Sequence, residues 1–264
     1  MGGGFRRGGD GRLGFGAMRL PGIPGRLAVD HTTAVAVARR AVELGVTHID
    51  TAAFYTRGSS RANEILRRAL RPYPDGLTLA TKVGPGQDVR AAVEQNLTEL
   101  GLDALHLVHL QAGRPDEAAG ERFAELAKLR DEGLVRDLGL ADATRAQFAE
   151  ARTIAPVTAV QNRFGVHDQS DADLVDECAA AGVAYVARTP LGGGRAPFTD
   201  PELRKVARRH GATVHQVALA WGLARSPTLV QIPGTASLTH LEQNMAALRL
   251  ELDESEVALL ERLA

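Results

Sequence analysis

The chain has 264 residues, of which 44% are hydrophobic and 24% charged, a profile typical of a soluble globular protein with one large core. Its formal net charge of -1 gives no electrostatic reason to expect a nucleic-acid or membrane partner, and no apolar run reaches the roughly 18 residues that span a bilayer. The single cysteine, Cys178, excludes an internal disulfide and fits a reducing cytoplasm, which is the location we expect.

The first residues, 1–12, are rich in glycine and arginine, and we expect them to form a flexible tail before a single domain at 13–264. From there, short apolar segments typical of β-strands alternate with longer segments of helical periodicity. Several helical segments end in glycine just before the next strand, as helix C-caps often do. The predicted strands are residues 13–20, 46–50, 77–84, 105–111, 135–141, 157–164, 183–189 and 229–233.

This alternation, without a proline- or serine-rich linker between halves, predicts an α/β fold in which a parallel sheet closes into a (β/α)8 TIM barrel. An open doubly wound sheet is the alternative. Against it, the glycines of "GFGAMRLPGIPG" neither have the spacing of the dinucleotide fingerprint nor open a helix. In a barrel, side chains at the C-terminal ends of the strands converge on one mouth, where the active site lies.

Three chemically active residues fall at this mouth. Asp50 closes the second strand, Tyr55 lies in the loop after it, and Lys82 lies near the end of the third strand. Free tyrosine has a pKa near 10, a neighbouring ammonium lowers it, and a carboxylate keeps that ammonium charged and in place. The three side chains therefore predict a proton donor for a carbonyl that receives hydride. The alternative is a structural Asp50–Lys82 ion pair beside a loop aromatic.

Several segments together resemble the aldo-keto reductases, NAD(P)H-dependent barrels that reduce aldehydes and ketones. They are "HIDTAAFY", "LATKVG", "VQN", "PLGGG" and "IPGT…HLEQNMAAL", and they occur in family order from about Arg12 to the end of the chain. The chain is most similar to the bacterial branch that contains pyridoxal reductases. The resemblance implies that Asp50, Tyr55 and Lys82 are catalytic, with Tyr55 as the proton donor, and no metal is expected.

The family's fourth catalytic residue is usually a histidine at the end of the fourth strand, where this chain has Gln111. In one interpretation, the Gln111 amide N–H orients the carbonyl in its place. In the other, His109 serves; it lies two residues earlier on the same face, about 6–7 Å further from the mouth. A core histidine with no catalytic role is the third possibility for His109.

The implied nicotinamide pocket also departs from the family pattern. Asp142 replaces the usual asparagine and can accept a hydrogen bond from the carboxamide but not donate one, whereas Gln161 matches the family's other carboxamide ligand. Arg188 replaces the aromatic residue that usually stacks on the ring. Its guanidinium plane can stack there, which would favour the reduced ring over the cationic oxidised one, or it can pair with Asp142 across the mouth.

The remaining cofactor contacts implied by the resemblance lie in two later segments. Leu191 and Gly192 belong to "PLGGG", and His240 stands where many relatives have arginine. The residues expected near the adenosine phosphate and adenine are Gly234, Thr235, Ser237, His240, Gln243 and Asn244. Ser237 could equally be the N-cap of a helix. Backbone N–H groups and small polar side chains at a helix start suit a phosphate. We expect NADPH as the cofactor, with NADH less favoured.

The segments that cover the substrate in many relatives are short here. The loop after the fourth strand is "AGRPDE", and the chain stops soon after "ELDESEVALLERLA". We therefore expect an open mouth that takes a bulky or varied carbonyl compound, with pyridoxal as the leading candidate and a natural-product carbonyl next. Arg57, Arg61, Arg163 and Arg188 could face it and would suit an anionic or phenolic substrate, although solvated loop charges are the favoured interpretation of Arg57 and Arg61.

Three hypotheses follow for the function. The first is an NADPH-dependent carbonyl reductase that takes its proton from Tyr55. The second, motivated by Gln111, Asp142 and Arg188, is a barrel of the same ancestry with non-redox chemistry such as dehydration or cyclisation. The third is a nucleotide-binding regulatory subunit without activity, which the intact Asp50, Tyr55 and Lys82 argue against. We expect a monomer or a weak homo-oligomer.

Overall fold

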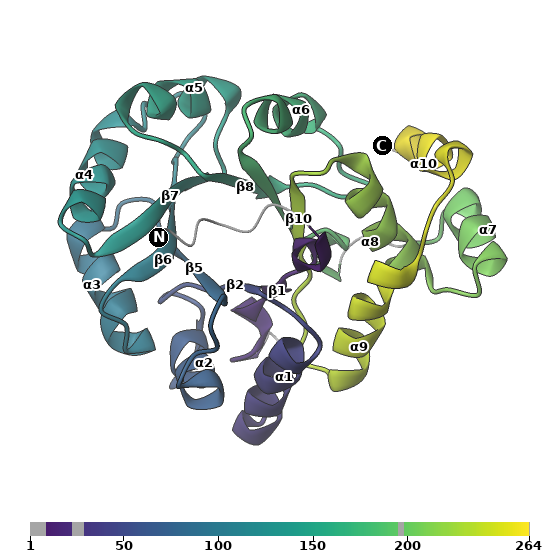
Figure 1. Ribbon diagram of the computed structural model, residues 1–264, viewed down its shortest axis with the longest axis horizontal. Helices are drawn as coiled ribbons and strands as arrows, with labels where there is room; N and C mark the ends of the chain where they lie inside the picture. The colour runs from purple at the N-terminus through teal and green to yellow at the C-terminus, as the bar shows by residue number, and fades with distance from the viewer. Residues whose placement is uncertain (1–8, 23–28, 195–197, 264) are drawn as a thin grey trace.

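Eight parallel strands form the centre of the fold in the computed structural model, which describes residues 9–22, 29–194 and 198–263. The strands are β1 (Phe15–Gly16), β2 (His48–Asp50), β5 (Thr78–Val83), β6 (Leu105–Gln111), β7 (Val135–Ala141), β8 (Ala159–Arg163), β9 (Ala184–Arg188) and β10 (Leu229–Ile232). Each pairs in parallel with the next, and a parallel bridge between Leu13 and Gln231 joins the two ends. The predicted single-domain barrel is therefore confirmed (Figure 1).

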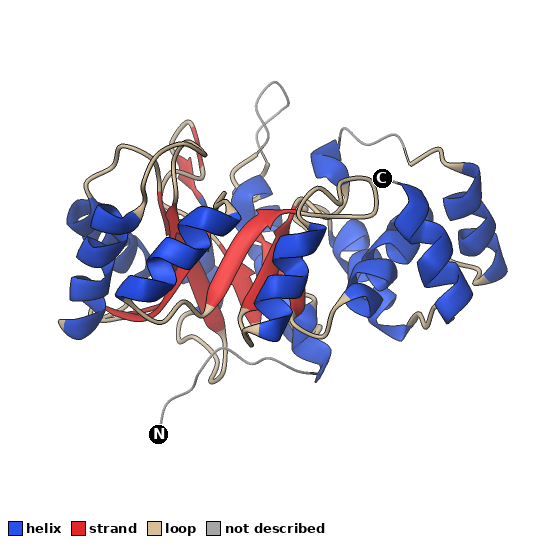
Figure 2. Ribbon diagram, turned by 90° about the horizontal axis from the view of Figure 1, so that it is seen from above, coloured by secondary structure: helices blue, strands red, loops and turns tan. Residues whose placement is uncertain are grey.

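Helices surround these strands, as the side view shows (Figure 2). They are α1 (His31–Glu43), α2 (Ala62–Leu70), α3 (Val89–Leu100), α4 (Gly120–Asp131), α5 (Arg145–Ile154), α6 (Ala172–Ala180), α7 (Pro201–Arg209), α8 (Val214–Arg225), α9 (Leu238–Ala246) and α10 (Glu254–Leu260). Side-chain caps fix several starts: Thr144 and Thr213 each form a capping box with a glutamine three residues later. Among the described helices, none combines the length and the hydropathy that crossing a membrane would require.

The predicted C-terminal limit of the first strand is wrong. The first strand ends at Gly16, because Ala17–Arg19 turn into a 3-10 helix in which Leu20 N donates to Ala17 O at 2.9 Å. Part of the predicted tail is also ordered. Gly9–Arg12 form another 3-10 helix, held by Arg12, whose Nη1 donates to the carbonyls of Leu223 and Ser226 at 2.6 and 3.0 Å. The rest of that tail, residues 1–8, lies outside the described residues.

A small apolar cluster fills the inside of the barrel below the mouth. Its members are Ala80, Leu107, Ala159, Ala184, Val186, Val230 and Ile232. Alternate residues of a strand face the same side. The residues two or four positions further along the same strands therefore point inward at the mouth, and these are Lys82, Gln111, Gln161 and Arg188. The alternation of the strands alone thus delivers four polar side chains to one place.

Candidate active site

A cavity of about 540 Å³ lies at the C-terminal ends of the strands. Most of the predicted residues line it: Asp50, Tyr55, Lys82, Gln111, Asp142, Gln161, Arg188, Leu191, Gly234, Thr235, His240, Gln243 and Asn244. Gly192 and Ser237 do not belong to its wall. The hydroxyl of Ser237 instead caps α9 by accepting a hydrogen bond from His240 N at 3.3 Å.

The three predicted catalytic residues meet at the base of this cavity. Lys82 Nζ lies 2.5 Å from Asp50 Oδ1, and both residues are only 3% exposed. The same ammonium lies 5.0 Å from the centroid of the Tyr55 ring. Gln161 completes the group, because its Nε2 donates to Asp50 Oδ1 at 2.7 Å. The carboxylate is therefore fixed between two donors from different strands.

The pKa of Tyr55 is shifted in the direction opposite to the one predicted from the sequence. Burial raises the pKa of Tyr55 above its ordinary value of 10.0, and the Lys82 ammonium offsets only part of that effect. Burial also acts to lower the pKa of Lys82, but Asp50 and Tyr55 outweigh it, so the pKa of Lys82 is raised. The phenol thus keeps its proton and the lysine its charge. Sequence reasoning anticipated a lowered tyrosine pKa because it could not weigh burial against the ammonium.

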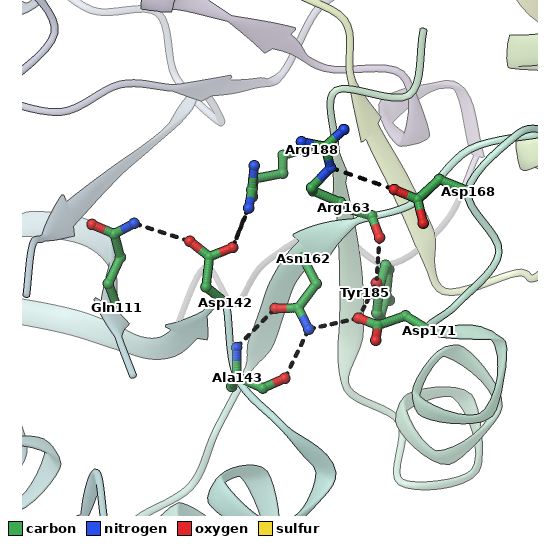
Figure 3. Close-up of polar contacts among 9 residues, drawn as sticks. All are labelled: Gln111, Asp142, Ala143, Asn162, Arg163, Asp168, Asp171, Tyr185 and Arg188. Carbon is green, nitrogen blue, oxygen red and sulfur yellow. Dashed lines mark hydrogen bonds and ion pairs between the residues drawn. The ribbon is translucent and has the colours of Figure 1, made fainter. Parts of the chain in front are cut away.

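Gln111, Asp142 and Arg188, the three departures from the family pattern, form one connected network (Figure 3). Gln111 Nε2 donates to Asp142 Oδ2 at 3.0 Å. Arg188 contacts the other carboxylate oxygen, Oδ1, through Nε at 3.0 Å and through Nη2. The pairing of Arg188 with Asp142, one of the two predicted alternatives, is the one that the structure shows.

A second set of hydrogen bonds holds the backbone at Asp142, which has a φ of 53° that non-glycine residues rarely adopt. Asn162 brackets the next residue, accepting from Ala143 N at 3.0 Å and donating to Ala143 O at 2.8 Å. Asp171 Oδ2 in turn accepts from Asn162 at 2.6 Å and from the Tyr185 hydroxyl at 2.8 Å (Figure 3). Asn162 belongs to the segment "VQN", in which only Gln161 was predicted to have a role.

His109 is a core histidine. It is fully buried, does not line the cavity, and its Nδ1 lies 3.2 Å from Leu140 O. Burial and the nearby Lys82 charge lower its pKa to about 3, so the ring is neutral. Gln111, the last residue of β6, occupies the position that faces the cavity, and His109 does not.

The four arginines expected near the mouth differ in whether they reach the cavity. Of the four, only Arg188 lines the cavity. Arg61 lies 3.4 Å from Glu99, and Arg163 lies 3.4 Å from Asp168. A second arginine, Arg19, also lines the cavity and was not anticipated. It forms no ion pair with any of the described residues.

Several other wall residues were missed by sequence reasoning. They are Gly16, Met18, Arg19, Phe54, Thr189, Pro190, Gly193, Gly194, His215, Ile232 and Pro233. Met18 and Phe54 are among the exposed large hydrophobic residues described, at 49% and 41%. The Phe54 and Tyr55 rings meet edge to face with centroids 5.3 Å apart. The position of Phe54 directly before the predicted proton donor was a signal that could have been used.

The wall has features that fit a dinucleotide. Gln161 Oε1 is buried and has no hydrogen-bond partner among the described residues, so it can accept from a carboxamide NH2. Gly193 and Gly194 belong to the wall and Gly192 precedes them; all three have positive φ, at 64°, 83° and 63°, which glycine adopts without steric cost. Because these residues have no side chains, a ligand can approach the backbone closely. By contrast, the described residues contain no cluster of His, Cys, Asp or Glu arranged to hold a metal ion.

The profile of the Aldo/keto reductase family matches residues 12–264, and the chain belongs to this family of oxidoreductases. It is 42% identical to pyridoxine 4-dehydrogenase of Escherichia coli strain K12, over 95% of this chain and 93% of that protein. Among solved structures it is similar to an aldo-keto reductase from Klebsiella pneumoniae in complex with NADPH, with a TM-score of 0.85, 28% identity, and coverage of 100% and 95%. A thermostable aldo-keto reductase in complex with the inhibitor epalrestat has a TM-score of 0.86, 28% identity, and coverage of 96% and 95%.

Proposed function

We propose that this protein reduces an aldehyde or ketone to an alcohol with NADPH, and that Tyr55 donates the proton. The observation that carries the proposal is the Asp50–Lys82–Tyr55 group at the base of one cavity, with a protonated phenol and a charged ammonium. NADPH is favoured over NADH because related structures hold NADP or NADPH. The free, buried state of Cys178 supports work in a reducing cytoplasm.

Each residue at the base of the cavity has a distinct part in this reaction. When bound, the cofactor supplies a hydride for the carbonyl carbon. Tyr55 gives its proton to the carbonyl oxygen, and the Lys82 ammonium stabilises the phenolate that remains on Tyr55. Asp50 keeps that ammonium charged and fixed. Gln161 anchors Asp50 through its Nε2 and offers its free Oε1 to the carboxamide of the cofactor.

The other end of the cofactor would contact the loop and helix after β10. Gly234, Thr235, His240, Gln243 and Asn244 line that part of the cavity, and Leu191 lines it from the loop after β9. Ser237 would act indirectly, by capping α9 and so fixing the first turn that carries His240. Gly192 would contribute through the backbone conformation of its loop rather than through the wall itself.

An aromatic substrate fits the apolar rim next to Tyr55. Met18 and Phe54 expose large hydrophobic surfaces there, which a planar ring can cover. Arg19, without an ion-pair partner among the described residues, adds a positive charge that suits a phenolic or anionic group. Pyridoxal, an aromatic aldehyde with a phenolic oxygen, is therefore the leading candidate, and the name of the Escherichia coli relative points to the same class of compound.

The pH dependence of carbonyl reduction should reflect the raised pKa of Tyr55. The phenol must be protonated to donate, and its pKa lies above 10.0, so this group imposes no loss of kcat/KM below pH 10. Above that pH the phenol ionises and kcat/KM should fall. Alcohol oxidation needs the phenolate and should instead rise with pH. Initial rates in both directions across the pH range check this, and loss of reduction with an apparent pKa near 7 would contradict it.

Titration with NADPH by fluorescence, followed by absorbance at the reduced-nicotinamide band with pyridoxal and simple aldehydes, tests the proposed function. We expect NADPH to bind saturably and the absorbance of reduced nicotinamide to fall only when a carbonyl compound is added. Tight binding without turnover of any carbonyl would support a regulatory nucleotide-binding protein. The absence of binding would support non-redox chemistry, for which the network of Gln111, Asp142 and Arg188 is the motivation.

A further inference from the structure

The ends of β8 and β9 carry two arginines side by side, Arg163 and Arg188, which are partners in the sheet register. Each contacts its own aspartate. Figure 3 shows the two ion pairs. Arg188 and Asp142 line the cavity, whereas Arg163 and Asp168 do not. The two ion pairs therefore have similar chemistry in adjacent positions, and only one of them faces the cavity.

The pair at the cavity is held more firmly than its neighbour. Nε and Nη2 of Arg188 both donate to Asp142 Oδ1, and Gln111 occupies Oδ2. The side chains are one-third exposed, 31% for Arg188 and 33% for Asp142, whereas those of Arg163 and Asp168 are 50% and 41% exposed. Fixed charges in a partly buried site act on neighbouring charges more strongly than solvated ones.

This ion pair also lies within electrostatic range of the reacting groups. The positive charge of Arg188 is one of the influences that lower the pKa of Tyr55, although burial dominates. A hydride donor must come within about 3–3.5 Å of the carbonyl carbon that Tyr55 serves. Asp142 and Arg188 line the same cavity as Tyr55, so a nicotinamide ring that delivers hydride beside Tyr55 would share the cavity with both charges.

This inference rests on the proposed function: we propose that Asp142 neutralises the charge that Arg188 presents to the nicotinamide, so that charge at this position gives the site little preference between oxidised and reduced dinucleotide. The oxidised ring carries a positive charge and the reduced ring is neutral. Arg188 repels the oxidised ring, Asp142 attracts it, and together the two charges nearly cancel. A single arginine at this position, without Asp142, would discriminate strongly against the oxidised form.

Dissociation constants for NADPH and NADP+ in the wild type and in charge variants test this directly, without measuring turnover. Asp142→Asn leaves the arginine uncompensated, so the ratio of Kd for NADP+ to Kd for NADPH should rise about tenfold, the size expected for one unit charge in a partly solvated site. Arg188→Met leaves the carboxylate uncompensated, and the ratio should fall by about the same factor. The double variant should return close to the wild-type ratio.

Two further variants separate charge from structure. Arg188→Lys keeps the positive charge and should keep the ratio near that of the wild type, whereas a merely structural role would weaken both dinucleotides equally. Asp168→Asn, in the neighbouring pair, should leave the ratio unchanged. Ratios that stay constant, or that move in the same direction for Asp142→Asn and Arg188→Met, would overturn this inference and leave the proposed function intact. If the wild type bound neither NADPH nor NADP+, this inference and the proposed function would both be wrong.

Discussion

Replacing Tyr55 with phenylalanine should lower kcat for carbonyl reduction by about 10²–10⁴-fold, the usual contribution of a positioned general acid. The variant loses only the hydroxyl oxygen, so the ring keeps its edge-to-face contact with Phe54 and its place beside Lys82. The Kd for NADPH should therefore stay nearly unchanged. A lower kcat with an unchanged Kd would show that the hydroxyl stabilises the transition state and does not contribute to cofactor binding. Steady-state kinetics and a fluorescence titration of the same preparation give both values.

Tyr73→Phe is the matched control for this experiment. The Tyr73 hydroxyl donates to Leu100 O at 2.8 Å, and the residue does not line the cavity. Its removal should affect stability slightly and leave kcat unaltered. If Tyr55→Phe kept most of the wild-type turnover, the proton would come from another donor, and the assignment of Tyr55 would be wrong.

Replacing Lys82 with methionine should destabilise the fold as well as abolish reduction. Asp50 would remain as a carboxylate with 3% exposure and no ammonium beside it. Breaking a buried pair on one side typically costs about 3–5 kcal/mol in the free energy of unfolding. Equilibrium unfolding in urea should show a lower midpoint with a similar slope, and NADPH consumption should be lost in parallel.

The double variant Lys82→Met with Asp50→Asn separates the two effects. It removes both charges, and the new amide oxygen can still accept from Gln161 Nε2, so much of the lost stability should return. Activity should not return, because no ammonium remains to stabilise the phenolate of Tyr55. If Lys82→Met had the same urea midpoint as the wild type, the Asp50–Lys82 ion pair would contribute little to the free energy of unfolding.

Sequence patterns predicted the strands best where apolar runs are bounded by clear turn signals. The limits 105–111 and 135–141 agree with β6 and β7. The first strand was predicted too long because its short pairing depends on contacts with β10 rather than on local sequence, including the 2.7 Å bond from Gly14 N to Gln231 O. The hairpin of β3 (Thr56–Arg57) and β4 (Ser60–Arg61) was missed because its residues are polar.

The residues of the site were also predicted only in part. Strand ends and motifs placed Asp50, Lys82 and Gln161 at the mouth, since the period of a strand fixes which side chains point inward. The direction of the Tyr55 pKa shift was not accessible, because it depends on burial by residues from distant segments. Arg19 was missed because it follows the first strand in a turn with no periodic pattern, and only the closed barrel brings it to the cavity.

Deuterium transfer measures directly whether a carbonyl bound beside Tyr55 receives hydride from nicotinamide. The enzyme would be incubated with pyridoxal and with NADPH deuterated at both C4 positions, and the product alcohol analysed by mass spectrometry. We expect one deuterium at the carbinol carbon, in equal amount to the NADP+ formed. Conversion of the carbonyl compound without deuterium incorporation and without NADP+ would show that this barrel carries out a different chemistry.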